Sequence, residues 1–361
     1  MTDRFPIRKI DHLRFYCGNA LHAAEWYRNK FGFDIIGYSG LETGSKNEAS
    51  YLLQQGDVRF LMTSSLRPDD PIGALVGKHG DFVRDVCFEV DSVEESFKNA
   101  VASGAEPVNE PLFIEDSFGK VHLASIKTYG DVIHTFLNRD SFSGLFLPNF
   151  VPMDKKGQGV GLQFVDHVVG NVELGGMNYW AQWYAKVLNF EQLVHFDDKD
   201  ISTEYTALMS KVMQSGNGRV KFPINEPAEG KKKSQIDEYL EFHGGAGVQH
   251  IAIHTEDIIK TISELRKREI EFLAVPRTYY DTVKERVGEI QEPLDVIADL
   301  GILVDRDDEG YLLQLFTKPV EPRPTLFFEI IQRRGAKSFG KGNFKALFEA
   351  IEREQQLRGT L

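Results

Sequence analysis

The sequence predicts an α+β protein made of two pseudo-symmetric open β-barrel halves, each built from paired βαβββ units with its helices outside. The segment from Ile10 (IDHLRFYCGNALHAAEWYRNKFGF) resembles the segment from Val165 (VDHVVGNVELGGMNYWAQWYAKVLNF). Each begins with a short apolar strand and a turn, and each continues as an amphipathic helix that carries a Trp-Tyr pair. Strands follow these helices in runs, which favours mixed curled sheets over a doubly wound parallel sheet.

Two further similarities support the repeat. The segment from Asp85 resembles the one from His250, since each alternates apolar and polar residues and then starts a helix with acidic residues. The strand-like stretch that ends at Arg139 resembles the one that ends at Arg333. The halves join within residues 141–161, a stretch rich in Gly, Pro and mixed charge. We expect one domain over residues 1–150 and a second over residues 151–361.

Composition excludes several classes of partner. The 361 residues carry a formal net charge of −12. This acidity disfavours nucleic acid and anionic membranes as partners, because both bind basic surfaces. Cys17 and Cys87 form neither a CxxC motif nor a disulfide framework, which indicates a reducing compartment. No stretch has the length of a membrane span, and the first residues hold no apolar leader. We expect a soluble cytoplasmic protein.

The stretch TLFFEIIQR, residues 325–333, is predicted to be a strand although Glu329 lies in its middle. A buried carboxylate needs a partner, so Glu329 could face water at a sheet edge or pair with a buried Arg. His167 in QFVDHVVG and His250 in GVQHIAI offer another explanation. Two imidazoles and one carboxylate form the facial triad of non-haem Fe(II) sites, which leaves positions for substrate and O₂. These three residues are the candidate Fe(II) ligands.

The repeat supplies a comparison within the chain. His12 occupies the place of the first histidine, but Asp85 occupies that of the second and Thr135 that of the glutamate. The first half therefore keeps one ligand of three, and we expect it to be structural and free of metal. His254 lies beyond the second histidine, either as a group that supports the site or as an ordinary histidine at a strand end.

Polar and aromatic residues near this set suggest a pocket. Gln249 precedes the second histidine, Gln314 lies in LLQLFTKP and Asn225 in FPINEP. Buried amides can hold a carboxylate or a phenol, although a Gln beside a turn is usually structural. The segment SFGKGNFKALFEAIEREQQL predicts a loop and an amphipathic helix. This helix either packs on the core or closes as a lid, with Phe339 and Phe344 excluding water.

A rival hypothesis comes from GAKSFGKG, which begins at Gly335 and nearly matches the phosphate-binding pattern GxxxxGK[ST]. It would make the protein a nucleotide-binding module. However, Gly342 replaces the Ser or Thr that would hold Mg²⁺, and bulky Phe339 occupies the loop. The iron site is therefore the better hypothesis.

Longer motifs resemble the 4-hydroxyphenylpyruvate dioxygenase family over nearly the whole chain: GVQHIAI, YLLQLFTKP, RPTLFFEIIQR and FGKGNFKALFEAIEREQ, with NEP and KSQI upstream. The resemblance implies the vicinal oxygen chelate fold, with Fe(II) held by His167, His250 and Glu329 in the C-terminal barrel. It also implies conversion of 4-hydroxyphenylpyruvate and O₂ to homogentisate and CO₂, a step of tyrosine and phenylalanine catabolism.

The same resemblance implies a set of pocket residues. The polar residues that would line the substrate pocket are Ser210, Asn225, Gln235, Gln249 and Gln314. The residues that would enclose the aromatic ring are Phe316, Phe327, Phe339 and Phe344, with Asn343 and Leu347 on the lid helix. Phe327 lies two residues before Glu329 and so shares its strand face.

Two enzymes with the same ligand set remain as alternatives. 4-Hydroxymandelate synthase uses the same substrate but oxidises the benzylic carbon, and that branch tends to carry aliphatic residues where this chain has Asn225 and Phe344. Those two positions favour the ring-hydroxylating enzyme. An extradiol ring-cleaving dioxygenase is a more remote alternative. We expect a homo-oligomer, either a dimer or a tetramer, acting on a small molecule.

Overall fold

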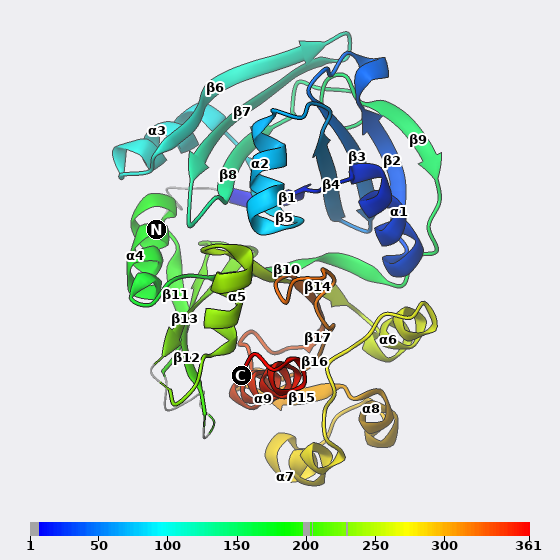
Figure 1. Ribbon diagram of the computed structural model, residues 1–361, viewed down its shortest axis with the longest axis vertical. Coiled ribbons are helices and arrows are strands. Elements are labelled where there is room, and N and C mark those ends of the chain that lie inside the picture. Colours follow the sequence, from blue (N-terminus) through cyan, green and yellow to red (C-terminus); the bar gives the residue numbers. More distant parts are fainter. Residues whose placement is uncertain (1–6, 198–202, 204, 229) are drawn as a thin grey trace.

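The computed structural model describes residues 7–197, 203, 205–228 and 230–361, and it shows two curled sheets stacked one above the other (Figure 1). The first sheet has nine strands in the order β6-β7-β8-β5-β1-β4-β3-β2-β9. These strands are β1 (Ile7–Tyr16), β2 (Asp34–Ser39), β3 (Glu48–Gln55), β4 (Val58–Ser65), β5 (Phe82–Val90), β6 (Pro107–Asp116), β7 (Gly119–Lys127), β8 (Ile133–Asn138) and β9 (Val151–Lys155).

The second sheet has eight strands in the order β11-β12-β13-β10-β14-β17-β16-β15. These strands are β10 (Leu162–Asn171), β11 (Glu191–Phe196), β12 (Ala207–Gln214), β13 (Lys221–Ala228), β14 (Gly247–Thr255), β15 (Leu303–Arg306), β16 (Tyr311–Phe316) and β17 (Phe327–Arg334). Its three central strands, β10, β14 and β17, carry the candidate metal ligands.

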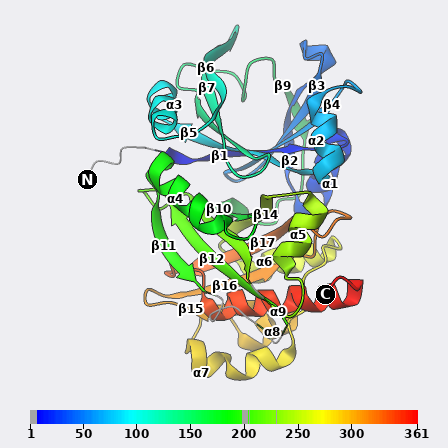
Figure 2. The same cartoon turned by 60° about the vertical axis from the view of Figure 1, so that its left-hand side comes forward.

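Helices lie mostly on the outside of the two sheets, and the C-terminal helix runs along the second sheet between α5 and β15 (Figure 2). The helices are α1 (Ala20–Phe31), α2 (Pro71–His79), α3 (Val93–Ala102), α4 (Gly176–Leu188), α5 (Gln235–His243), α6 (Ile258–Lys267), α7 (Val283–Val287), α8 (Leu294–Leu300) and α9 (Lys341–Arg358), with 3₁₀ turns η1 (Leu41–Thr43) and η2 (Arg277–Thr282). Within the described residues, none of these helices combines the length and the apolar character needed to cross a bilayer.

Both halves use one pairing scheme, which confirms the predicted α+β class and its repeated architecture. β1 is antiparallel to β5 and parallel to β4, and β10 is likewise antiparallel to β14 and parallel to β13. β8 lies parallel to β5 as β17 lies parallel to β14. The halves differ after α3 and α6, the third helix of each half. β6 follows α3 directly, whereas η2, α7 and α8 lie between α6 and β15.

The connection between the halves belongs partly to the first sheet. β9 pairs with β2, so the expected boundary after residue 150 falls just before the last strand of that sheet. The connection then passes close to Gly32, which ends α1 with a φ of 79°. A Cβ at Gly32 would lie 2.2 Å from the carbonyl oxygen of Gln158. The close approach therefore requires glycine at this position.

One aromatic core joins the two sheets. The rings of Phe31 and Phe328 have centroids 4.9 Å apart, and those of Phe88 and Phe222 lie 6.0 Å apart. Each pair takes one ring from each half, and all four side chains are fully buried. Because burial of such rings is a major source of folding free energy, the halves stabilise each other.

Candidate metal centre

Three side chains that are far apart in the sequence converge inside the second sheet. Oε2 of Glu329 lies 3.1 Å from Nε2 of His167 and 3.4 Å from Nε2 of His250. The three side chains offer ligand atoms that all lie within 4.8 Å of one another, and each residue is at most 3% exposed. The structure therefore brings together the three residues that the sequence singled out as ligands.

Strand register explains this convergence. Ala252 on β14 pairs with His167 on β10 and with Glu329 on β17, so these three residues form one row across the sheet. The central member of the row carries only a methyl group, which leaves space between the imidazole and the carboxylate. His250 lies two residues before Ala252 and therefore points to the same face.

The carboxylate of Glu329 is ionised and attracts positive charge. Burial acts to raise the pKa of Glu329, but the two imidazoles outweigh it and lower that pKa to about 2. Burial lowers the pKa of His250, whereas the neighbouring carboxylates hold the pKa of His167 above its ordinary value against the effect of burial. An ionised carboxylate beside two imidazole nitrogens is a donor set that fits a transition metal such as Fe(II).

Asp166 and Arg333 support His167 and were missed by the sequence analysis. Oδ1 of Asp166 accepts a hydrogen bond from Nδ1 of His167 at 2.8 Å. Arg333 in turn donates two hydrogen bonds of 2.8 Å to Asp166. Placing the ring proton on Nδ1 leaves the lone pair of Nε2 directed to the centre, which is how second-shell carboxylates orient metal ligands. The repeat could have revealed both residues, because an Asp precedes each matching histidine and an Arg ends each matching strand.

A chain of amides and hydroxyls connects Glu329 to the C-terminal helix. Nε2 of Gln314 donates to Oε1 of Glu329 at 2.7 Å, and Oε1 of Gln314 accepts from Asn343 of α9 at 2.8 Å. Tyr279 donates to Oδ1 of Asn343 at 2.8 Å and receives a hydrogen bond from Arg286 at 2.8 Å. Tyr279 and Arg286 lie in the segment that only the second half has, so the repeat could not point to them.

The predicted aromatic residues lie around the histidines. Phe327 stacks on His250 with ring centroids 4.6 Å apart, and Phe316 meets His250 edge-on at 5.9 Å. Phe339 meets His167 edge-on at 4.7 Å. Phe344 and Leu347 pack farther along α9: Phe344 stacks on Phe196 at 5.2 Å, and Leu347 joins the cluster that contains Phe316 and Phe327.

A second group of predicted residues presents polar atoms that no described residue of the chain pairs with. Ser210 and Asn225 pair across β12 and β13, and Asn225 donates to Asn171 at 3.3 Å. The buried atoms without a hydrogen-bond partner among the described residues include Ser210 Oγ, Asn225 Oδ1, Gln235 Oε1 and Asn171 Nδ2. Buried polar groups are normally satisfied, so this arrangement indicates a polar ligand. Gln249, in contrast, has a hydrogen-bond partner within the protein, since its Oε1 lies 3.0 Å from Nδ1 of His250.

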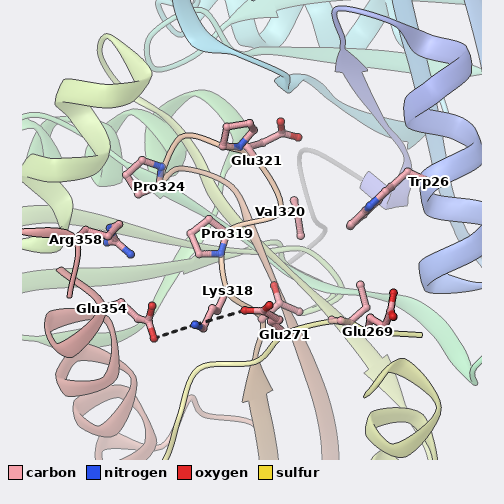
Figure 3. A pocket seen from close by; sticks show the side chains of 13 residues that line it. Trp26, Glu269, Glu271, Lys318, Pro319, Val320, Glu321, Pro324, Glu354 and Arg358 are labelled. Carbon is pink, nitrogen blue, oxygen red and sulfur yellow. Dashed lines mark ion pairs between the residues drawn. The ribbon is translucent and has the colours of Figure 1, made fainter. Parts of the chain in front are cut away.

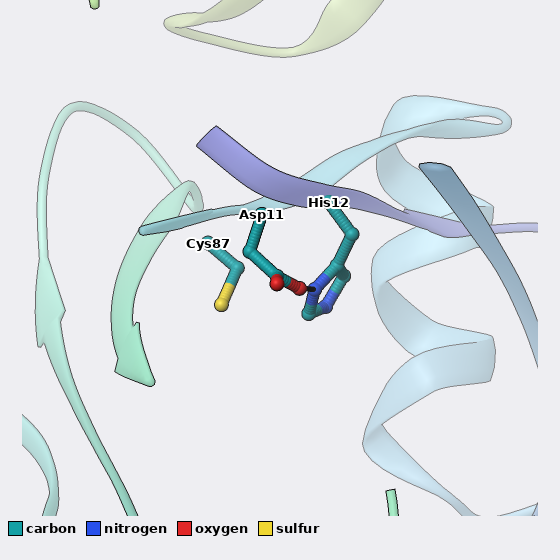
Figure 4. A group of neighbouring side chains, drawn as sticks. All are labelled: Asp11, His12 and Cys87. Atoms are coloured by element: carbon teal, nitrogen blue, oxygen red, sulfur yellow. Dashed lines mark hydrogen bonds and ion pairs between the residues drawn. The ribbon is translucent and has the colours of Figure 1, made fainter. Parts of the chain in front are cut away.

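The first half holds a partial counterpart of this centre. Asp11, His12 and Cys87 lie close together (Figure 4), with ligand atoms within 4.8 Å of one another. However, Arg139 donates to both oxygens of Asp11, at 2.7 and 2.5 Å, and burial raises the pKa of the Cys87 thiol. A guanidinium and a neutral thiol oppose cation binding. Asp11, His12 and Arg139 are the equivalents of Asp166, His167 and Arg333, while Cys87 takes the place of Ala252. We still predict a first half free of metal.

The loop that suggested a nucleotide site has other contacts. The backbone N–H groups of Lys337 and Ser338 donate to Asp307, at 2.7 and 2.8 Å. Those of Gly342 and Asn343 donate to Asp305, at 2.6 and 3.0 Å. The backbone N–H groups that would bind a phosphate already donate to carboxylates of the chain. The geometry therefore contradicts the nucleotide-binding hypothesis.

A surface pocket of about 390 Å³ lies between Trp26 and the end of α9, where Lys318 pairs with Glu271 at 3.5 Å and Glu354 at 3.4 Å (Figure 3). It touches none of the three candidate ligands. A narrow pocket of about 20 Å³ adjoins it and also touches Gln249 and Phe327. The residues common to both pockets are Thr317, Pro319, Pro324, Glu354 and Arg358.

Comparison with known proteins assigns this fold and site to a class. The sequence profile of the Glyoxalase/Bleomycin resistance protein/Dioxygenase superfamily matches residues 9–112 and 165–315, and the second range includes His167 and His250. A curated relative in Yarrowia lipolytica is 47% identical, over 98% of this chain and 94% of its own length, and one in Dictyostelium discoideum is 48% identical, over 98% and 99%. Both are named 4-hydroxyphenylpyruvate dioxygenase. The chain belongs to the 4-hydroxyphenylpyruvate dioxygenase family within this superfamily, and it is an enzyme.

Solved structures agree with this assignment. A triple mutant of 4-hydroxymandelate synthase from Streptomyces coelicolor superposes with a TM-score of 0.88 at 30% identity, covering 97% of this chain and 99% of that one. A halotolerant catechol dioxygenase superposes with a TM-score of 0.52 at 10% identity, covering 90% and 87%, which shows the shared fold alone. The identity of 30% to the synthase is thus lower than the identities of 47% and 48% to the two 4-hydroxyphenylpyruvate dioxygenases.

Proposed function

We propose that the chain converts 4-hydroxyphenylpyruvate and O₂ to homogentisate and CO₂, with Fe(II) held by His167, His250 and Glu329. Both oxygen atoms enter the product, one in its new carboxylate and one in its new ring hydroxyl, while the original carboxyl carbon leaves as CO₂. The convergence of two buried imidazoles and one buried carboxylate in a chain of this family is the observation that supports the proposal. When bound, Fe(II) supplies the chemistry that activates O₂ beside a chelated keto acid.

The side chains of this site orient and enclose the substrate. Asp166 holds the ring of His167 so that Nε2 faces the centre, and Gln314 fixes the carboxylate of Glu329. Phe316, Phe327 and Phe339 exclude water from this region, since all three are buried around the histidines. Closure of this kind protects reactive species from water.

The polar residues of β12, β13 and α5 recognise the polar ends of the substrate. Ser210, Asn225 and Gln235 each have a buried polar atom that finds no partner within the described part of the chain. A phenol and a keto acid offer donors and acceptors that satisfy such atoms. Gln249 and Gln314 line the same region from the sides of His250 and Glu329.

The C-terminal helix acts as a lid over this pocket. Asn343 of this helix donates a hydrogen bond to Gln314. Phe344 and Leu347, also on the helix, pack against Phe196 and against the cluster of Phe316 and Phe327. The pocket of Figure 3 and the narrow pocket beside Gln249 lie at the far end of the same helix, and we infer that substrate enters from this side. The ion pairs Lys318–Glu354 and Arg358–Glu238, at 3.4 and 2.7 Å, border this route.

The test is anaerobic loading of the purified chain with Fe(II), followed by O₂ uptake with 4-hydroxyphenylpyruvate and chromatography of the product. We expect homogentisate, with one O₂ consumed for each molecule of product. Formation of 4-hydroxymandelate would contradict the proposal and support the synthase, which the structural neighbour represents. Turnover of a catechol in place of the keto acid would support ring cleavage.

The remaining expectations concern the state of the protein in the cell. We infer a dimer or tetramer in the cytoplasm, with a metal-free first domain that supports the catalytic second one. The shared aromatic core supports this dependence between the halves, and the net charge of −12 supports the absence of a nucleic-acid partner. Light scattering of the purified chain tests the oligomeric state.

A further inference from the structure

A cavity of about 560 Å³ lies between the two halves, lined by residues of both sheets. Asp166 lines it, but none of the three candidate metal ligands does. Its volume is within the range of small-molecule sites, roughly 300–1,000 Å³. The cavity is therefore large enough for a ligand of its own.

The cavity lies where equivalent strands of the repeat face each other. Ile10 and Asp11 of β1 line it together with their counterparts on β10, Val165 and Asp166. Two hairpin turns of similar sequence, GDVRF at residues 56–60 and GRVKF at residues 218–222, also contribute to the wall. The turns differ in one feature of charge, because Asp57 in the first half corresponds to Arg219 in the second.

This difference gives the cavity a positive surplus in an acidic protein. The first half supplies two cations and two carboxylates to the wall. The second half supplies Arg219, Lys221 and Arg333 against only one carboxylate, Asp166. A concave surface with a surplus of one charge concentrates ions of the opposite sign.

The cations that line the cavity differ in whether they are paired. Arg333 is bonded to Asp166, and Arg59 lies 3.6 Å from Asp11. Lys9, Arg219 and Lys221, in contrast, make no ion pair with any residue in the described ranges. Lys221 is half-buried, and burial lowers its pKa, which is the effect expected of an ammonium group held away from water. An anion in the cavity would compensate these charges.

One wall of the cavity is flat and apolar. Phe164 is 43% exposed, and its ring stacks on that of His254 with centroids 4.5 Å apart and an angle of 11°. An exposed phenylalanine at a cavity wall offers a surface against which a planar ligand can pack. The sequence allows His254 to be either a supporting group or an ordinary strand-end residue, and the structure places it in this wall.

We propose that this cavity binds a small aryl carboxylate, with its ring against Phe164 and its carboxylate facing Arg219 and Lys221. The charge surplus selects an anion, and the stacked Phe164 and His254 select an aromatic body. Arg219, in the turn before β13, and Lys221, the first residue of β13, both line the cavity, so their side chains can face one anion together. The cavity shares Asp166 and Arg333 with the support of His167 but contains no candidate ligand of the metal, so binding of the aryl carboxylate requires neither the metal nor the proposed reaction.

The experiment titrates phenylacetate into the full-length chain without added metal, by isothermal calorimetry at low ionic strength. The double variant Arg219→Gln/Lys221→Gln should bind at least about tenfold more weakly, since it loses two charged donors. Lys98→Gln, which removes an exposed lysine of α3, and Glu329→Gln, which alters the metal centre, should bind as wild type does. Inorganic phosphate, which lacks a ring, and benzyl alcohol, which lacks a charge, should both bind more weakly than phenylacetate.

Several outcomes would overturn the proposal. Equal affinity for phenylacetate in the wild type and the double variant would show that Arg219 and Lys221 do not contribute to binding. Loss of binding in Glu329→Gln would place the phenylacetate at the metal centre. Phosphate binding as tight as that of phenylacetate would exclude the aryl requirement. If the double variant has an altered unfolding curve, Arg219→Gln alone serves as the test, because that side chain is exposed.

Discussion

Gln314 donates a hydrogen bond of 2.7 Å to Glu329, and this bond links the candidate metal centre to the C-terminal helix. The same side chain accepts from Asn343 of α9 at 2.8 Å. The orientation of the carboxylate and the position of α9 are therefore coupled through one amide. If α9 moves, the hydrogen bond between Asn343 and Gln314 breaks, and Gln314 is the residue that orients the carboxylate of Glu329.

Gln314→Met should lower both Fe(II) affinity and turnover, by roughly 10- to 100-fold, because outer-shell partners of metal ligands have effects of this size. Asn343→Ala keeps the bond between Gln314 and Glu329, so Fe(II) stoichiometry should stay at one while KM rises. Metal titration and steady-state kinetics of both variants measure the two effects. Unchanged Fe(II) affinity in Gln314→Met would show that the amide does not orient the carboxylate.

Glu329→Gln should abolish turnover and reduce bound iron to background while the chain remains folded, because the amide has the same size but no charge. Thr135→Ala is the matched control in the first half. Thr135 donates to the buried carboxylate of Asp85 at 2.5 Å, so the control should lose about 1–3 kcal/mol of stability and no iron. Iron content and thermal unfolding are the measurements, and loss of iron in Thr135→Ala would contradict a site confined to the second half.

Asp166→Asn should weaken Fe(II) binding by roughly 10- to 100-fold, because the amide no longer fixes the tautomer of His167. The equivalent change in the first half, Asp11→Asn, also removes a charge from a buried pair with an Arg but should leave Fe(II) binding intact. Both variants should unfold more easily, by about 3–5 kcal/mol. Parallel metal titrations decide the point, and equal loss of iron in both would indicate a general structural effect.

Glu321 should make stability depend on pH. Burial, with a contribution from Asp81, raises the pKa of Glu321 from 4.5 to about 8. The folded state then holds this proton more tightly than the unfolded chain, so the contribution of Glu321 to stability falls as pH rises from about 4.5 through 8. Glu321→Gln should remove the loss of stability that ionisation of Glu321 causes at high pH. The Tm of the variant should therefore be above that of wild type at pH 8.5 and close to it at pH 5. Parallel melting curves of the two proteins over that pH range test the prediction.

The sequence by itself determined the repeat, the fold class and the three candidate ligands. Glu329 was conspicuous because a strand interior rarely accepts an unpaired carboxylate, and the matching strand carries Thr135 instead. His167 and His250 followed because imidazoles on apolar strands complete a metal-binding set with this carboxylate, and the family motifs indicated the pocket residues. These signals are local or periodic, so they are legible without coordinates.

Only the tertiary structure decided which side chains meet. The row of His167, Ala252 and Glu329 depends on the register of β10, β14 and β17, and sequence patterns do not specify register between distant strands. Tyr279 reaches Asn343 from a segment that has no counterpart in the first half, so no comparison within the chain could reveal it. The cavity between the halves likewise exists only once the two sheets are stacked, because its charges come from turns far apart in the sequence that folding brings to one wall.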